Sequence, residues 1–167
     1  MTLHITQFEG SNALSSFRIQ QLLPALQGIH EKISGISARF VHLVASDVAP
    51  DAALSEKLAA LLIVVSPRLG TVSPWASKAT DIAHNCGLGV KRIERLVEYR
   101  LTLKNGLLSK TALTSEQLQQ VAALLHDRMT ESAMLERAQA QELFHALHPA
   151  PMDHVDVLGG GQAALEK

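Results

Sequence analysis

The sequence predicts an α+β domain, because segments with apolar residues at helical spacing alternate along the chain with segments in which every second residue is apolar. The chain has 167 residues, 47% of them apolar. A chain of this length buries roughly 70% of its unfolded surface, so it can form a core without disulfides. Its single cysteine cannot form an internal bridge, which is typical of proteins from reducing compartments.

The first expected elements are a strand at residues 3–9 and a helix capped by Ser11 or Asn12. Pro24 lies inside this helix, where it removes an N–H donor and should kink or end it. The buried stripe of the helix is expected to consist of Ile19, Leu22, Leu23 and Leu26.

Two strands are expected next. Residues 36–44 place their apolar side chains at even positions, which predicts a strand with one buried face. A loop is expected at residues 47–51. The β-branched, apolar run at residues 61–65 is typical of a buried strand. It follows a helical pattern with no glycine or proline between them, so the junction at residues 58–62 looks shortened.

Ser73 before Pro74 could cap a short turn, since proline suits the first helical position, and a helix is expected from Ser77 onward. Its expected buried face consists of Ala79, Ile82, Ala83 and Cys86. This stripe predicts a buried, unreactive Cys86. A thiol nucleophile paired with His84 is the alternative, but nearby helix positions point in different directions.

The remaining elements follow from alternation and capping signals. A long strand is expected around residues 97–103, with apolar Val97, Tyr99, Leu101 and Leu103 on one side and polar Glu98, Arg100 and Thr102 on the other. The spacing of Thr114 and Gln117 is that of a capping box. The later expected elements are a strand at 129–135, an amphipathic helix at 140–147, a glycine hinge at 159–161 and a helix beginning at 162.

The charge and motif content excludes several function classes. A formal charge of −1 and few aromatic residues argue against a nucleic-acid binder. No long apolar run or secretory signal is present, so we expect a cytoplasmic protein without membrane contact. The eight histidines show no metal-binding spacing, and the pair His145 and His148 is more typical of a solvated helix end than of a metal site.

The charges are unevenly distributed along the chain. Residues 67–110 carry eight Lys/Arg against three Asp/Glu, whereas residues 111–167 carry three against eight. Basic side chains in the middle segment could form a patch for phosphate or for an acidic partner, or could be ordinary charges on a solvated edge strand. This basic set is Arg68, Lys78, Arg92, Arg95 and Arg100. Trp75, in a loop rich in Ser and Pro, should pack the loop onto the core or anchor a partner.

The stretch PRLGTVSPWASKATDIAHNCGL at residues 67–88 resembles the N-terminal domain of the phosphoribosylformylglycinamidine synthase family, in its large single-chain form. Further similar segments follow in the family's order at residues 92–95, 99–100 and 125–131. The similarity extends from Ala13 to Gly159. The sequence departs from the family at the junction already noted, where family members usually carry a longer segment with further Gly and Pro residues.

The resemblance implies a fold and a role in purine biosynthesis. The implied fold is an antiparallel sheet with helices packed on it, similar to a duplicated small-subunit (PurS-like) domain, here at residues 1–148. Residues 149–167 would begin a linker to a synthetase domain. The implied enzyme uses ATP and Mg²⁺, in a synthetase region outside these residues, and ammonia from a glutaminase region to convert formylglycinamide ribonucleotide to its amidine.

Under this resemblance, the synthetase and glutaminase domains of the same polypeptide are the expected partners, and this piece carries no catalytic residue, metal site or cofactor of its own. The candidate interface residues are Arg68, Trp75, Lys78, Arg92 and Arg95. Two alternatives remain open on the residues alone. One is a free-standing module that binds an acidic partner or phosphate ligand through the basic middle segment, and the other is a thiol enzyme that uses Cys86.

Overall fold

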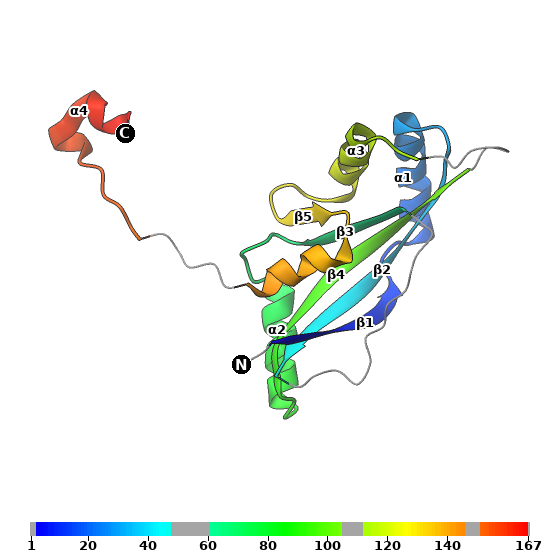
Figure 1. The fold of residues 1–167 in the computed structure, drawn as a ribbon, viewed down its shortest axis with the longest axis horizontal. Helices are drawn as coiled ribbons and strands as arrows, with labels where there is room; N and C mark the ends of the chain where they lie inside the picture. Colours follow the sequence, from blue (N-terminus) through cyan, green and yellow to red (C-terminus); the bar gives the residue numbers. More distant parts are fainter. Residues whose placement is uncertain (1–2, 48–60, 105–111, 146–150, 167) are drawn as a thin grey trace.

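The computed structural model describes residues 3–47, 61–104, 112–145 and 151–166. An antiparallel sheet of five strands in the order β1-β2-β4-β3-β5 forms its centre, with helices packed on it (Figure 1). The strands are β1 (His4–Asn12), β2 (Ile33–Ser46), β3 (Leu61–Pro67), β4 (Val90–Leu103) and β5 (Glu131–Met134). The helices are α1 (Ser16–Ile29), α2 (Pro74–Asn85), α3 (Ser115–Leu125), the 3₁₀ helix η1 (Arg137–Phe144) and α4 (Val157–Leu165). The predicted α+β class with an antiparallel sheet is confirmed.

The four longest strands form two consecutive units of the same kind. Strand β1, helix α1 and strand β2 make the first unit, and β3, α2 and β4 make the second. The long strands β2 and β4 pair antiparallel at the centre of the sheet, with Phe40 opposite Val97. The first strand of each unit pairs with the outer side of its own long strand. This repeated arrangement is compatible with the duplicated PurS-like domain that the resemblance implies.

The first helix begins later than the sequence predicts. The residues expected to cap it, Ser11 and Asn12, continue or end β1, and Ser15 is the cap, accepting a bond from the Arg18 N–H. The prediction failed because several Ser and Asn residues lie close together, and tertiary pairing of β1 with β2 decides among them. The helix does not end at Pro24, which was one of the two expected outcomes, since α1 continues to Ile29.

One side of the sheet, which we call the helix face, carries the core of the domain. Helices α1 and α3 cover it at one end, and α2 packs beside β4 at the other. Its fully buried side chains are Leu26, Ile33, Ile36, Ile63, Val65, Leu101, Val121 and Leu125. The predicted stripe of α1 is confirmed, because its four leucine and isoleucine residues belong to this cluster or pack against it.

The opposite side of the sheet, which we call the η1 face, is also covered. Its buried cluster contains Val41, Leu43, Val64, Leu96, Met134, Ala140 and Leu143. Strand β2 was expected to bury only its even positions, and this expectation is wrong. Ile36 and Ala38 are buried on the helix face, whereas Val41, Leu43 and Ala45 are buried on the η1 face. Both sides of β2 therefore lie in the interior.

Helix α2 presents a different side to the sheet than its pattern predicts. The fully buried residues of this helix are Ala76 and Ala83, whereas Ile82 is 53% exposed and Cys86 is exposed at the C-cap. Small side chains let the helix lie close to β4, where the Ile93 N–H donates to Thr80 Oγ1 at 3.0 Å. The expectation of a buried Cys86 is therefore wrong.

The C-terminal part differs from expectation in two ways. Residues 137–144 form a 3₁₀ helix rather than the start of an α-helix, although Ala140 and Leu143 are buried as predicted. Helix α4 begins before the glycine run and is interrupted at Gly161, whose φ is 54°. Figure 1 shows α4 apart from the sheet. The predicted loop at 47–51 and the shortened junction at 58–62 lie largely outside the described residues, and His148 lies entirely outside them. None of the helices in the described ranges has the length and apolar content needed to cross a membrane.

Candidate interaction groove

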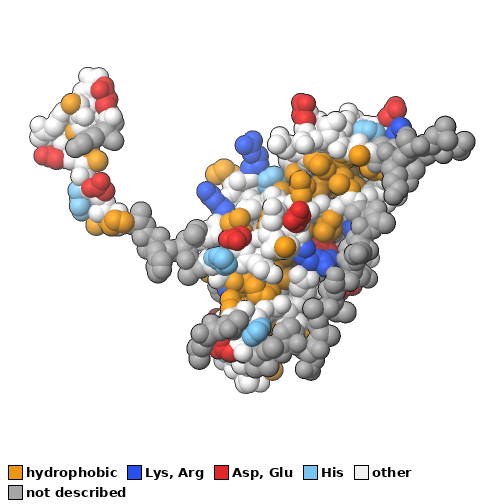
Figure 2. Space-filling view, viewed as in Figure 1, with side chains coloured by type: hydrophobic (Ala, Val, Ile, Leu, Met, Phe, Trp, Pro, Cys, Tyr) orange, Lys and Arg blue, Asp and Glu red, His pale blue; other side chains and the backbone are white. Residues whose placement is uncertain are grey.

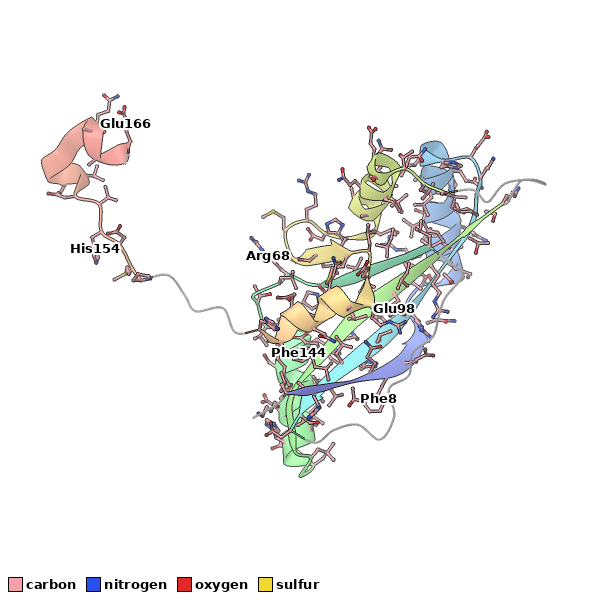
Figure 3. The ribbon with its side chains drawn as sticks, in the orientation of Figure 1. Phe8, Arg68, Glu98, Phe144, His154 and Glu166 are labelled. Carbon is pink, nitrogen blue, oxygen red and sulfur yellow. The ribbon has the colours of Figure 1, made fainter. Side chains whose placement is uncertain are left out.

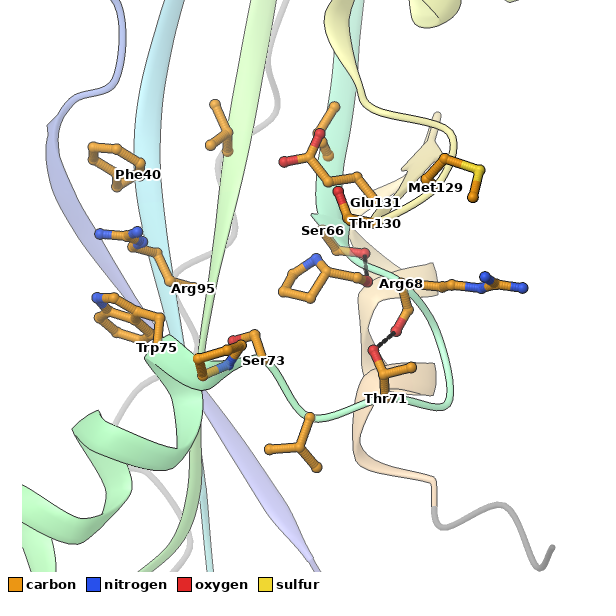
Figure 4. A pocket seen from close by; sticks show the side chains of 15 residues that line it. Phe40, Ser66, Arg68, Thr71, Ser73, Trp75, Arg95, Met129, Thr130 and Glu131 are labelled. Carbon is orange, nitrogen blue, oxygen red and sulfur yellow. Dashed lines mark hydrogen bonds between the residues drawn. The ribbon is translucent and has the colours of Figure 1, made fainter.

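A groove of about 570 Å³ opens on the helix face, beside the first turn of α2 (Figure 4). We call it the Trp75 groove. Its lining combines residues from β2, β3, β4, the β3–α2 loop and the turn before β5. These residues are Phe40, Val65, Ser66, Pro67, Arg68, Thr71, Val72, Ser73, Pro74, Trp75, Arg95, Val97, Met129, Thr130 and Glu131. The groove therefore brings together the proline-rich loop and part of the basic middle segment that the sequence singles out.

The loop between β3 and α2 is held in place by short-range bonds. The Arg68 carbonyl oxygen accepts from the Thr71 N–H at 3.2 Å and from the Thr71 hydroxyl at 2.6 Å. Gly70 has a φ of 79°, a left-handed conformation that a glycine adopts without strain. The Arg68 N–H donates to the Thr130 carbonyl at 2.9 Å, which joins this loop to the turn before β5.

The position of Trp75 is set by the start of α2. Ser73 is the N-cap, and its hydroxyl accepts from the Ala76 N–H at 3.0 Å. Pro74 lies in the first turn, so the short turn expected at Ser73 and Pro74 is part of α2, which begins before the expected start at Ser77. Trp75 consequently follows a rigid helix start, and its half-buried indole lies 5.5 Å from the His42 ring of β2.

Arg95 lies between two aromatic rings on one wall of the groove. Its guanidinium carbon is 4.6 Å from the centroid of the Phe40 ring and 4.6 Å from that of Trp75. Figure 4 shows the three side chains as a stack. Contacts of this kind favour a cation by about 0.5–2 kcal/mol and hold it in one orientation. Burial and the neighbouring Arg95 charge lower the pKa of His42.

The remaining predicted interface residues do not all reach the groove. Arg68 lines it, but its side chain extends away from the stack in Figure 4. Lys78 is exposed on α2 and is not among the lining residues. Arg92 stands on the η1 face, with its guanidinium carbon 5.7 Å from the Phe144 ring. The structure thus brings Arg68, Trp75 and Arg95 together and separates Lys78 and Arg92 from them.

Arg92 has an internal role that the sequence does not reveal. Its Nε donates to Glu94 Oε1 at 2.8 Å, and its Nη2 donates to the Thr71 carbonyl at 2.9 Å. It therefore ties the β3–α2 loop to a carboxylate that is fully buried. Because Arg92 and Arg95 point to opposite faces of the sheet, the basic set expected from the sequence does not form one patch. In Figure 2, acidic and basic side chains are also interspersed over the visible face.

A second buried carboxylate, Glu98, lies on the η1 face (Figure 3). Its Oε2 accepts from Arg39 Nε at 3.1 Å and from Arg137 Nη2 at 2.7 Å. Arg39 also forms an ion pair with Glu9. This network joins β1, β2, β4 and η1. This network is not predicted from the sequence, in which the one signal for it is the spacing of Glu94 and Glu98 on either side of Leu96.

The buried carboxyl of Glu94 should make the free energy of unfolding depend on pH. Burial raises the pKa of this carboxyl above 4.5, although Arg92 opposes the shift. The folded state then binds the proton more tightly than the unfolded state does. The free energy of unfolding therefore falls as the pH rises from 4.5 through the raised pKa of the folded state. We expect Glu94→Gln to remove that contribution. Urea unfolding at pH 4 and pH 7 should show the variant gaining stability relative to the wild type at the higher pH, whereas a difference independent of pH would contradict this assignment.

Among the described residues, Cys86 and His84, the pair that the thiol alternative needs, have separate backbone partners. Cys86 ends α2, and its N–H donates to the Ile82 carbonyl at 3.0 Å. His84 Nε2 instead lies 2.7 Å from the Val90 carbonyl oxygen. Within residues 3–47, 61–104, 112–145 and 151–166, no three His, Cys, Asp or Glu side chains are grouped in a way that could hold a metal ion.

The arrangement is suited to binding. A cation fixed between aromatic rings, in a groove lined also by the exposed Val72 and Met129, can seat a complementary group from another surface. Comparison with known protein families gives a match over residues 43–144 to the family described as formylglycinamide ribonucleotide amidotransferase N-terminal. The match covers more than half of the chain and includes the β3–α2 loop, α2 and β4.

Proposed function

Because the chain belongs to the formylglycinamide ribonucleotide amidotransferase N-terminal family, we propose that it is a non-catalytic domain that couples ammonia release to ammonia use in that purine-biosynthesis enzyme. On this proposal the complete enzyme converts formylglycinamide ribonucleotide to its amidine, using ATP, Mg²⁺ and glutamine. Its synthetase and glutaminase regions lie in the same polypeptide and are the partners of this domain. These 167 residues contact them and hold neither active site.

The observation that carries the proposal is the Trp75 groove. The segment that most resembles the family, residues 67–88, is the one that builds the groove's loop and the helix beside it. Hydrogen bonds within this segment fix the loop and the start of α2. Trp75 and the Arg95 guanidinium that stacks on it are therefore held in one geometry. A preorganised aromatic and arginine pair is what strong contacts between protein surfaces most often use.

Coupling has a physical purpose in such an enzyme. Free ammonia is protonated in water, and the ammonium ion is no longer a nucleophile. An enzyme that makes ammonia at one site and consumes it at another therefore gains from a domain that keeps the two regions in a fixed relation. A rigid sheet with a helix-built groove on one face supplies such a support without taking part in chemistry.

Replacing Trp75 by alanine in the full-length enzyme tests the coupling role. Truncating a Trp anchor typically costs about 2 kcal/mol or more of contact energy. We expect glutamine-dependent turnover to fall about tenfold, while turnover with added ammonium changes less than about twofold, because external ammonia bypasses the coupling. Both rates are measured as amidine formed per enzyme per second.

Two further variants make this result interpretable. Phe17→Ala removes an aromatic ring that is 64% exposed on α1, away from the groove, and should leave both rates unchanged. Trp75→Phe keeps a ring over Arg95 and should restore most of the glutamine-dependent rate. If Trp75→Ala lowers both rates equally, or neither, the coupling role is wrong.

A further inference from the structure

The guanidinium of Arg95 differs in its neighbours from three other partly buried arginines of the domain. Arg39, Arg92 and Arg137 each form an ion pair with a buried glutamate. No carboxylate in the described part of the chain forms an ion pair with Arg95, whose contacts there are the rings of Phe40 and Trp75. Stacking occupies the faces of a guanidinium and leaves its N–H donors at the edge free to bind.

The opposite wall of the groove does not supply the missing anion. Glu131 lines that wall, but its Oε2 already accepts from the Asp127 N–H at 2.8 Å. Figure 4 shows Glu131 and Arg95 on opposite sides of the open space. The cation is therefore held in position while the space in front of it stays open, which is an arrangement that complements an external carboxylate.

The apolar residues that line the groove indicate that its occupant also carries an apolar group. Val72 is 56% exposed and Met129 is 75% exposed, and both line the groove. The apolar Val65 and Val97 line it as well. A carboxylate followed or preceded by an apolar side chain in an extended segment would match both parts of this lining. Charge complementarity and the apolar lining together favour a peptide segment over a free inorganic anion.

We propose that the Trp75 groove binds an acidic segment from the remainder of the synthase polypeptide, with a carboxylate of that segment on the edge of Arg95 and a neighbouring apolar side chain against the apolar lining residues Val72 and Met129. The inference rests on the proposed function, in that it takes the partner to be another region of the same enzyme. It adds to that function the chemistry of the partner and the residue that recognises it.

Photo-crosslinking in the full-length enzyme tests this proposal. A benzoylphenylalanine placed at position 72 should crosslink to a segment outside residues 1–167 that contains Asp or Glu, as mapped by mass spectrometry. Arg95→Met keeps the apolar stem but removes the charge, and should lower the crosslink yield about tenfold, the loss expected for a charged hydrogen bond. Arg95→Lys should retain only part of the yield, because lysine cannot bind a carboxylate with two parallel bonds.

A matched control separates docking from general damage. Arg128→Met removes an exposed arginine that does not line the groove and should leave the yield at position 72 unchanged. Thermal melting of each variant should stay within a few degrees of the wild type. Crosslinks confined to residues 1–167, crosslinks to a segment without Asp or Glu, or a yield insensitive to Arg95→Met would overturn the proposal. Because contact is measured rather than turnover, the docking result stands or falls separately from the coupling role.

Discussion

Glu98→Ala is expected to lower the free energy of unfolding of the 167-residue chain by about 3–5 kcal/mol, the cost of removing one partner from a buried ion pair. The Glu98 side chain has no exposed surface and pairs with two arginines whose side chains are 16% and 18% exposed. The substitution leaves both guanidiniums largely buried without this counter-charge. It also opens a cavity between β4 and η1, so both effects act in the same direction.

Urea unfolding followed by circular dichroism measures this loss. Glu98→Gln keeps the side-chain volume and one acceptor, and we expect it to lose less than the alanine variant. Glu142→Ala removes a carboxylate that is 59% exposed and pairs with the exposed His145, so it should change stability by less than about 0.5 kcal/mol. A Glu98→Ala variant as stable as Glu142→Ala would mean that the network does not hold η1 to the sheet.

Local signals in the sequence predicted local structure well. The Thr114 capping box forms as expected, because it uses atoms only three residues away. The turn capped by Ser73 was also recognised, although it opens α2 itself rather than preceding a helix from Ser77. The strand at residues 61–65 was also found, since an apolar β-branched run leaves few alternatives. Such features depend on neighbours in the sequence, which are visible without any knowledge of the fold.

Features that depend on distant partners were predicted poorly. Glu98 was placed on the polar side of its strand, because alternation alone cannot show that Arg39 and Arg137 will cover it. The buried side of β2 was misjudged because η1, which covers the second face, comes about a hundred residues later in the chain. Cys86 was assigned to the core because its helix packs through alanines rather than through the largest apolar side chains.

The Trp75 groove likewise contains residues that the sequence indicated and one whose role depends on distant pairing. Arg68, Trp75 and Arg95 were singled out from composition and from the resemblance, and the groove contains all three. Phe40, which forms one side of the Arg95 stack, was expected only as a core residue of its strand. Its role could not be predicted because it depends on the register of β2 with β4, in which Arg95 lies opposite His42 and Phe40 opposite Val97. The limits expected for the domain, residues 1–148, remain a prediction.

The most direct test of the coupling claim is the number of glutamate molecules released for each amidine formed by the full-length enzyme carrying Arg95→Glu. Reversing this charge places a carboxylate against the acidic partner proposed for the groove, and like charges in contact cost several kcal/mol. We predict that the ratio rises several-fold above the value near one expected of the wild type, because glutamine is hydrolysed without capture of its ammonia. Arg128→Glu should leave the ratio unchanged. A folded Arg95→Glu enzyme that still releases one glutamate per amidine would contradict the claim that this domain couples the two reactions through the Trp75 groove.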